Sequence, residues 1–238
     1  MVFAPHSELA NVWLLGLLVI WGALLFGSTE RRQMAMATHL RLGSSLTLVV
    51  AAWSWYLVAR ATPAVALFAL LVALGMTLGF LGDLLLADAL SIPQGFLAGM
   101  AAFALGHLAY ITAILSQTPQ VQWAVEGFAL LVGLAGWYLV VFRGGKDVMI
   151  LRWAALPYAL LLATTAGLAL GLAIQTSAFL PLAFGAALFL LSDLLVAGEQ
   201  FGNVRFPHIG DAVWLTYGPA QMLIVYAVNS ALVAAALH

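Results

Sequence analysis

The chain has 238 residues, of which 65% are hydrophobic and 7% are charged, and its net charge is −1. Soluble domains ordinarily have about 45–50% apolar and about 25% charged residues, so this chain is expected to be solvated by lipid rather than by water. Its eight basic residues are scattered, which argues against a nucleic-acid-binding surface. Because it has no cysteine, disulfides, thiolate nucleophiles and cysteine-ligated metal centres are excluded.

Eight apolar stretches follow one another along the chain, separated by short polar or Pro/Gly-containing connections. Each stretch is close to or longer than the ~20 residues that a membrane-spanning helix needs. The predicted spans are Leu9–Phe26, Leu40–Ala59, Ala64–Ala87, Gly95–Leu115, Val121–Phe142, Met149–Ile174, Leu180–Ala197 and Ala212–Leu237. The first is expected to be retained, since it lacks a basic n-region and a small-residue cleavage site. The sequence therefore predicts an all-α, polytopic membrane helical bundle, with residues 1–238 forming a single integral-membrane domain.

The basic residues predict an orientation for this bundle. All but Arg60 flank a connection that follows an odd-numbered span; these are Arg31, Arg32, Arg41, Arg143, Lys146, Arg152 and Arg205. Lys and Arg favour cytoplasmic loops, so both termini are predicted to be non-cytoplasmic. In a bacterial cell the protein would lie in the cytoplasmic (inner) membrane.

The third and seventh spans resemble each other at an offset of 110 residues. The segment 73–87 matches the segment 183–197 at eight of fifteen positions, and Asp83 and Asp193 are among the matches. The seventh span comes four spans after the third, so both helices run in the same direction. A parallel 4+4 internal repeat would explain the match; the alternative is a shared bias toward Leu and Ala.

Composition does not explain these two aspartates. A charged group at a helix centre costs ~2.5–3.5 kcal/mol on insertion scales, so ionisable residues inside spans are functional candidates. Each aspartate lies four residues before the last Ala of its span, about 6 Å in from the same edge at 1.5 Å per residue. If the two side chains meet across a cavity, one could be a neutral acid while the other is a carboxylate. This pairing is used in general acid–base catalysis. The alternative is two helix-end carboxylates solvated at the interface. Glu126, near the outer end of the fifth span, is expected to reach water.

Other polar and small residues share helix faces with one another. Gly75, Gly79 and Asp83 follow an i, i+4, i+8 pattern, which favours close helix packing or leaves room for a lipid chain. Three residues of the fourth span share a face (Phe103, His107 and Tyr110), as do two of the last (Tyr217 and Gln221). His107 could equally be a hydrogen-bonded packing residue. Ser192 precedes Asp193, but the side chains point about 100° apart on a helix, a poor geometry for a relay.

Four ordered blocks of sequence resemble the YhhN family of membrane proteins, also known as the lysoplasmalogenase family. They are Leu81-Gly82-Asp83-Leu84-Leu85, Phe103-Ala-Leu-Gly106-His107-Leu-Ala-Tyr110, Gly185-Ala-Ala-Leu-Phe189-Leu-Leu-Ser192-Asp193 and Tyr217-Gly-Pro-Ala-Gln221. Their order and spacing agree with the family over nearly the whole chain.

The resemblance implies hydrolysis of the vinyl-ether bond of lysoplasmalogens to a fatty aldehyde and glycerophosphocholine or glycerophosphoethanolamine. It implies no metal and no organic cofactor, and its partners would be a lysophospholipid substrate and membrane lipid, with no obligate protein partner. Asp83 and Asp193 are the hypothesised catalytic pair, and the sequence leaves open which of them is the acid. The residues expected to orient or bind the substrate are His107, Tyr110, Tyr217, Gln221, Gly79, Gly82 and Ser192.

Two other classes of membrane protein also use buried aspartates. A small proton-coupled transporter would suit the internal repeat, although neither half has an evident Gly/Pro-broken span. An aspartyl intramembrane protease carries a Gly-x-Gly-Asp motif and a later Pro-Ala-Leu. Here Gly79 is one residue too far from Gly82-Asp83, and Pro-Ala-Leu is absent.

Overall fold

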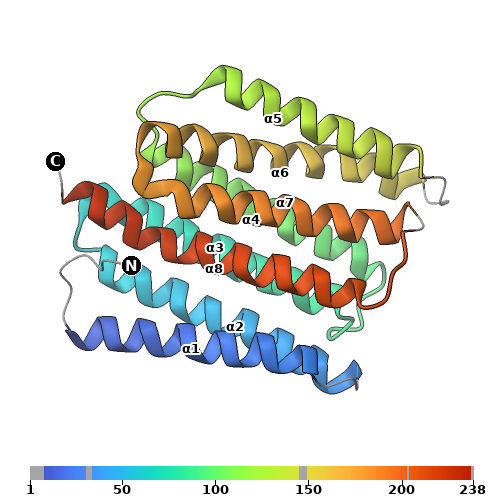
Figure 1. Ribbon diagram of the computed structural model, residues 1–238, viewed down its shortest axis with the longest axis horizontal. Coiled ribbons are helices and arrows are strands. Elements are labelled where there is room, and N and C mark those ends of the chain that lie inside the picture. The colour runs from blue at the N-terminus through green and yellow to red at the C-terminus, as the bar shows by residue number, and fades with distance from the viewer. Residues whose placement is uncertain (1–7, 31–33, 145–148, 203, 237–238) are drawn as a thin grey trace.

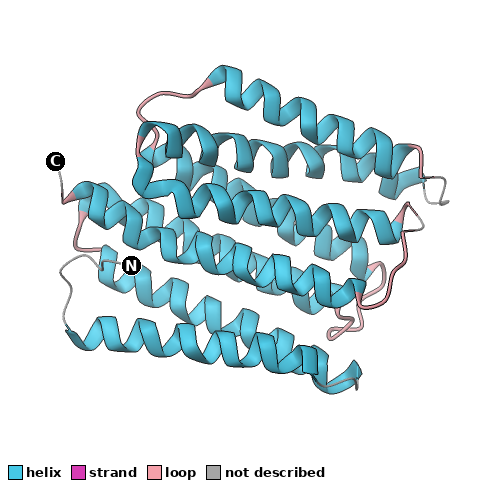
Figure 2. Ribbon diagram, in the orientation of Figure 1, coloured by secondary structure: helices cyan, strands magenta, loops and turns pink. Residues whose placement is uncertain are grey.

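A computed structural model describes residues 8–30, 34–144, 149–202 and 204–236 as a bundle of eight long helices, with no β-strand in these ranges. Figure 1 shows the helices side by side, and Figure 2 shows the short loops that join them. The helices are α1 Glu8–Glu30, α2 Met34–Ala59, α3 Pro63–Leu86, α4 Gly95–Gln117, α5 Trp123–Gly136, α6 Met149–Gln175, α7 Leu180–Gln200 and α8 Ile209–Ala235. A short 3₁₀ turn, η2 (Ser177–Phe179), precedes α7.

All eight predicted spans are confirmed as helices that are long and apolar enough to cross a membrane. The protein is therefore a multi-pass integral membrane protein. The boundaries differ from prediction by a few residues: α2 begins at Met34 rather than at Leu40, and α7 continues to Gln200. Four residues that were used to predict the orientation and the spans lie outside the described residues: Arg31, Arg32, Lys146 and Leu237.

Successive helices are antiparallel, so α1 begins and α8 ends at the same end of the bundle (Figure 1). The connections that follow odd-numbered helices lie at the opposite end, which we call the odd-loop end. The described basic residues other than Arg60 lie near the helix ends at the odd-loop end or in the connections there. Which side of the membrane this end faces stays a prediction from the charge distribution.

Both halves of the bundle have the same pattern of neighbouring helices. In the first half α1 packs on α2, α2 on α3 and α3 on α4, and the corresponding contacts from α5 to α8 occur in the second half. Between the halves α2 packs on α8, and α6 packs on α4 in the same way. A parallel 4+4 repeat would produce this arrangement.

Close backbone contacts involve one pair of corresponding positions in the two halves, Gly75 and Gly185. A Cβ at Gly106 of α4 would lie 3.1 Å from the carbonyl oxygen of Gly75, and one at Gly185 of α7 would lie 2.9 Å from that of Ala220. Gly75 and Gly185 are themselves separated by the 110-residue offset of the repeat. Small residues thus bring α3 against α4 and α7 against α8, as expected for membrane helices, which lack a hydrophobic drive to associate.

The fifth span departs from prediction in two ways. Its last part, η1 (Trp137–Phe142), is a π-helix rather than an α-helix, and such segments are frequent at functional sites. Glu126, which was expected to reach water, is instead buried, with 7% of its surface exposed. The reason is the close approach of α5 to Gly167 of α6, where an added Cβ would lie 3.3 Å from the Glu126 Cα.

A candidate active-site cavity between the two aspartates

A cavity of about 680 Å³ lies within the bundle, bordered by side chains of helices α2 to α8. Its volume falls in the range of about 300–1,000 Å³ that is usual for small-molecule sites. Most of its wall is apolar, and the ionisable or hydroxyl-bearing side chains in it are Thr38, Arg41, Asp83, Tyr158, Ser192, Asp193 and Tyr217. The two aspartates that the repeat singles out therefore border one cavity, which is one of the two arrangements considered from the sequence.

Asp83 lies on the last turn of α3 and is held by donors from two other helices. Its Oδ2 accepts a hydrogen bond from the hydroxyl of Ser45 on α2. The same oxygen accepts one from the hydroxyl of Tyr217 on α8, at 3.0 Å. Only 5% of the residue is exposed, so Asp83 is not a helix-end carboxylate at the surface. Two donors from separate helices restrict the orientation of the carboxyl.

A chain of hydrogen bonds continues from Tyr217 away from the cavity. The Gln221 amide donates to the Tyr217 hydroxyl oxygen at 3.1 Å, and the Tyr110 hydroxyl donates to Gln221 Oε1 at 2.8 Å. Gly79 makes room for this chain, because a Cβ there would lie 2.9 Å from the Gln221 amide nitrogen. Four predicted site residues, Asp83, Tyr110, Tyr217 and Gln221, are therefore joined in one network. Tyr110 and Gln221 reach Asp83 only through Tyr217.

Asp193 has different surroundings. It lies on α7, is partly exposed, and accepts a hydrogen bond from the hydroxyl of Tyr158 on α6. Because α7 continues to Gln200 while α3 ends at Leu86, the two aspartates lie at different distances from the ends of their helices. The equal distance from the helix ends that the sequence suggested is therefore not found.

Sequence reasoning found Tyr217 but missed Ser45, the other donor to Asp83, and Tyr158, the donor to Asp193. The sequence feature that could have indicated them is a hydroxyl side chain within a mostly apolar span. That signal is weak, because Ser and Thr hydroxyls within helices commonly donate to backbone carbonyls of the preceding turn. Ser44, the neighbour of Ser45, does so, donating to the carbonyl of Arg41 at 2.7 Å.

A cluster of aromatic rings packs beside the Asp83 network. Phe103 of α4, Phe189 of α7 and Tyr217 have ring centroids 5.3–6.1 Å apart in edge-to-face arrangements. Gly82 allows this packing, since a Cβ there would lie 2.6 Å from the Phe103 ring. The spaces beside the two stripe glycines are likewise filled, by the Tyr110 ring at Gly75 and by the Gln221 amide at Gly79, so of the two roles considered for the stripe the structure shows helix packing.

Comparison with known proteins places the sequence in a family. The model of the YhhN family matches residues 36–228, which is most of the chain. The chain belongs to the YhhN family.

Two mammalian relatives carry a name that describes an activity. Lysoplasmalogenase TMEM86B of Sus scrofa is 34% identical over 137 residues, covering 58% of this chain and 55% of the pig protein. Lysoplasmalogenase TMEM86B of Homo sapiens is 37% identical over 134 residues, covering 56% of this chain and 53% of the human protein. The match thus spans about half the length of these curated relatives. No solved structure matches the chain.

His107 of this YhhN-family protein stands apart from the network. Its Nδ1 lies 2.9 Å from the hydroxyl of Thr165 on α6, and its ring packs on Phe189 with centroids 4.6 Å apart. The ring also lies near Tyr110 and Tyr158, with centroids 5.9 and 6.1 Å away. This geometry is that of the hydrogen-bonded packing residue considered from the sequence. Its buried Nε2 has no hydrogen-bond partner among the described residues.

Ser192 borders the cavity next to Asp193, but its hydroxyl is directed elsewhere. The Oγ donates to the carbonyl of Val213 on α8 at 3.2 Å. This bond connects α7 to α8. It agrees with the expectation that Ser192 and Asp193, as adjacent helix residues, are poorly placed for a proton relay. Among the described residues of this YhhN-family protein, no cluster of three His, Asp or Glu side chains is placed to hold a metal ion.

Proposed function

We propose that this protein hydrolyses the vinyl-ether bond of a lysoplasmalogen, releasing a fatty aldehyde and a glycerophospho-base. The observation that carries the proposal is the presence of Asp83 and Asp193, from helices of opposite halves, in the wall of one largely apolar cavity. Membership of the YhhN family and the names of the pig and human relatives support the class of substrate.

The cavity suits a single-chain lipid. Toward α5, η1 and α6 its wall, apart from Tyr158, is apolar and includes Val132, Trp137, Val141, Ala155 and Leu162. Val132 is also 43% exposed and belongs to α5, which lies at the edge of the bundle (Figure 1), so we place the lipid-facing opening of the cavity in this part. The alkenyl chain would occupy this part, while the ether oxygen would lie near the aspartates.

Cleavage of a vinyl ether begins with transfer of a proton to its β-carbon. The α-carbon then becomes an oxocarbenium ion, to which water adds with loss of a proton. The resulting hemiacetal loses the glycerol oxygen as an alcohol and leaves the aldehyde. One water is consumed: the donated proton stays on the β-carbon in the aldehyde, and the proton lost by the attacking water restores the acid. This chemistry needs a proton donor and a negative charge near the cation, which two carboxyl groups can supply, as they do in glycosidases.

The surroundings of the two carboxyls suggest how they divide these tasks. The Oδ2 of Asp83 accepts two hydrogen bonds, from Ser45 and Tyr217, and is therefore fixed as an acceptor facing the cavity region. We assign Asp83 to stabilisation of the oxocarbenium ion. Asp193 has one donor, Tyr158, and is the more exposed of the two. We assign Asp193 to proton donation and to the subsequent activation of water.

Measurement of aldehyde release by the purified protein tests the proposal. Asp83→Asn and Asp193→Asn should each lower kcat for lysoplasmenylcholine by about 100-fold or more, which is the range of a lost acid–base group. Asp88→Asn is the matched control, because Asp88 is an exposed aspartate just beyond α3 whose positive φ of 54° Asn tolerates. Normal aldehyde release by folded Asp83→Asn or Asp193→Asn protein would overturn the assignment.

A proton-coupled transporter is the second candidate, and the similar packing of the two halves favours it. Proteoliposomes distinguish the two functions. A transporter should move a solute in response to a proton gradient and release no aldehyde from a lysoplasmalogen, whereas the proposed hydrolase should release aldehyde without a gradient.

A further inference from the structure

The cavity wall contains a basic residue that has no part in the proposed chemistry. Among the described lining residues this is Arg41 of α2, near the odd-loop end. Its side chain is only 15% exposed. A cation in a largely apolar wall is costly unless it meets an anion, so Arg41 calls for an explanation.

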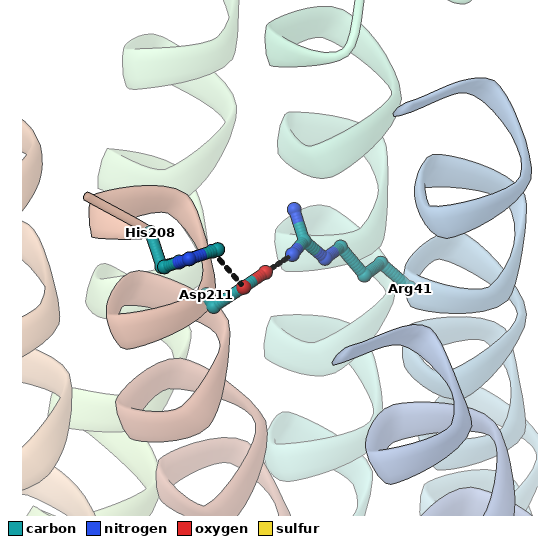
Figure 3. A network of polar contacts seen from close by, with 3 residues as sticks. All are labelled: Arg41, His208 and Asp211. Atoms are coloured by element: carbon teal, nitrogen blue, oxygen red, sulfur yellow. Dashed lines mark hydrogen bonds and ion pairs between the residues drawn. The ribbon is translucent and has the colours of Figure 1, made fainter. Parts of the chain in front are cut away.

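Contacts from α8 hold the guanidinium in place. Its Nη2 donates to Oδ1 of Asp211, whose Oδ2 lies 3.4 Å from Nδ1 of His208 (Figure 3). The Arg41 Cζ also lies 6.0 Å from the centre of the Trp214 ring, and Trp214 is itself a cavity-lining residue. Arg41 is therefore positioned before any ligand binds.

The ion pair with Asp211 leaves part of the guanidinium unused. The Nε of Arg41 is buried and has no hydrogen-bond partner among the described residues. A guanidinium carries five N–H donors in a planar fork that matches the oxygens of a phosphate. A phosphodiester in the cavity could accept hydrogen bonds from the donors that Asp211 does not use.

The spacing between Arg41 and Asp83 fits the geometry of a lysophospholipid. Arg41 and Ser45 lie one helical turn apart on the same face of α2, about 6 Å along its axis. Ser45 donates to Asp83, so Arg41 lies about one turn from the proposed reaction centre, toward the odd-loop end. In a lysoplasmalogen only the glycerol unit separates the vinyl ether from the phosphodiester. A phosphate at Arg41 would therefore leave the vinyl ether beside Asp83.

We propose that Arg41, positioned by Asp211 and Trp214, binds the phosphodiester of the substrate and makes the site selective for lysophospholipids over uncharged alkenylglycerols. This inference rests on the proposed function. The competing explanation is that the Arg41–Asp211 pair only ties α2 to α8.

Two kinds of variant separate these explanations. Arg41→Gln removes both the cation and the ion pair, whereas Asp211→Asn removes the ion pair but keeps the cation. Arg60→Gln is the matched control, because Arg60 lies just beyond the other end of α2 and is exposed. Arg41→Lys keeps a positive charge without the fork.

The first measurement is binding of a non-hydrolysable 1-O-alkyl lysophosphatidylcholine and of the matching 1-O-alkylglycerol. Arg41→Gln should weaken binding of the phospholipid by about 10- to 100-fold, the effect of a lost charge-assisted hydrogen bond. Binding of the alkylglycerol should change much less. Asp211→Asn, which keeps the cation but removes one of the contacts that position it, and Arg41→Lys should each weaken binding of the phospholipid less than Arg41→Gln does, and Arg60→Gln should match the wild type.

The second measurement is the ratio of kcat/KM for lysoplasmenylcholine to that for 1-alkenylglycerol, which Arg41→Gln should lower mainly through KM. If Arg41→Gln and Asp211→Asn weaken both ligands equally, or if the wild type does not prefer the phospholipid, the inference is wrong. Binding needs no turnover, so a wild type that binds the ether phospholipid through Arg41 but releases no aldehyde would contradict the proposed function alone.

Discussion

The hydroxyl of Tyr217 donates a hydrogen bond of 3.0 Å to the carboxyl of Asp83, joining residues that are 134 positions apart in the chain. The bond connects α8 of the second half to α3 of the first. It also places the Asp83 carboxyl at one end of a hydrogen-bonded chain whose other members, Gln221 and Tyr110, are fully or almost fully buried. The orientation of Asp83 thus depends in part on packing between the halves.

Loss of the Tyr217 hydroxyl should impair catalysis more than folding. Tyr217→Phe keeps the ring among Phe103 and Phe189 but removes one of the two donors to Asp83. We expect kcat for aldehyde release to fall by about tenfold, the equivalent of about 1.4 kcal/mol. Tyr226→Phe is the control: Tyr226 is a buried tyrosine of the same helix whose hydroxyl donates to the carbonyl of Leu14. The role of Tyr217 would be refuted if the two variants had the same kcat.

The outer members of the network should act through Tyr217. Gln221→Leu and Tyr110→Phe each interrupt the chain without touching Asp83, so each should reduce kcat less than Tyr217→Phe does. The effects of substitutions within one hydrogen-bond network are not additive. In a double-mutant cycle, Gln221→Leu should therefore have little further effect in a Tyr217→Phe background. Additive effects of the two substitutions on kcat would show that Gln221 acts independently.

Tyr158 is expected to support Asp193 as Tyr217 supports Asp83. Tyr158→Phe removes the donor to Asp193 while leaving a ring beside His107. If Asp193 is the proton donor, the variant should lower kcat and displace the pH–rate profile relative to wild type, because the environment of the acid has changed. Thr165→Val, which removes the hydroxyl bonded to His107 rather than to an aspartate, is the comparison. A profile identical to that of the wild type would remove Tyr158 from the mechanism.

Chain-length preference should depend on the apolar part of the cavity. Ala155 is buried, with 6% of its surface exposed, and borders the cavity on α6. Ala155→Leu should shorten the alkenyl chain that the enzyme accepts best, since the added atoms occupy space assigned to the chain. The measurement is kcat/KM over a series of chain lengths, with Ala101→Leu on the exposed face of α4 as control. An unchanged optimum in Ala155→Leu would place the chain elsewhere.

Helix contacts at matching positions should be sensitive to one added methyl group. In Gly185→Ala the new Cβ would meet the carbonyl oxygen of Ala220 and the Cβ of Leu223, both at 2.9 Å. Overpacking of this kind costs about 1–3 kcal/mol, so the Tm in detergent should fall. Gly127→Ala, at an exposed position of α5 with no atom within 4 Å of the added Cβ, should leave the Tm unchanged or raise it. Equal Tm values for the two variants would mean that the α7–α8 contact can relax.

Hydropathy alone predicted the eight helices, because crossing a bilayer imposes a local requirement on each stretch of about 20 residues. The offset match between the third and seventh spans also marks Asp83 and Asp193. Helix periodicity placed Tyr217 and Gln221 on one face, and in the structure they are hydrogen-bonded to each other. These properties depend on residues that are neighbours along one helix.

Packing between helices decided the rest. Ser45, Tyr158 and Arg41 are polar residues within spans that are mostly apolar, and nothing in their local sequence indicates which helix each will face. Glu126 shows the same limit, since its place near a span end predicted contact with water but close packing on Gly167 buries it. The sequence by itself determined a membrane bundle with two unusual aspartates. Only the tertiary structure decided that they share a cavity and which side chains hold them, because the rotation of each helix about its axis depends on the small residues where its backbone meets its neighbours.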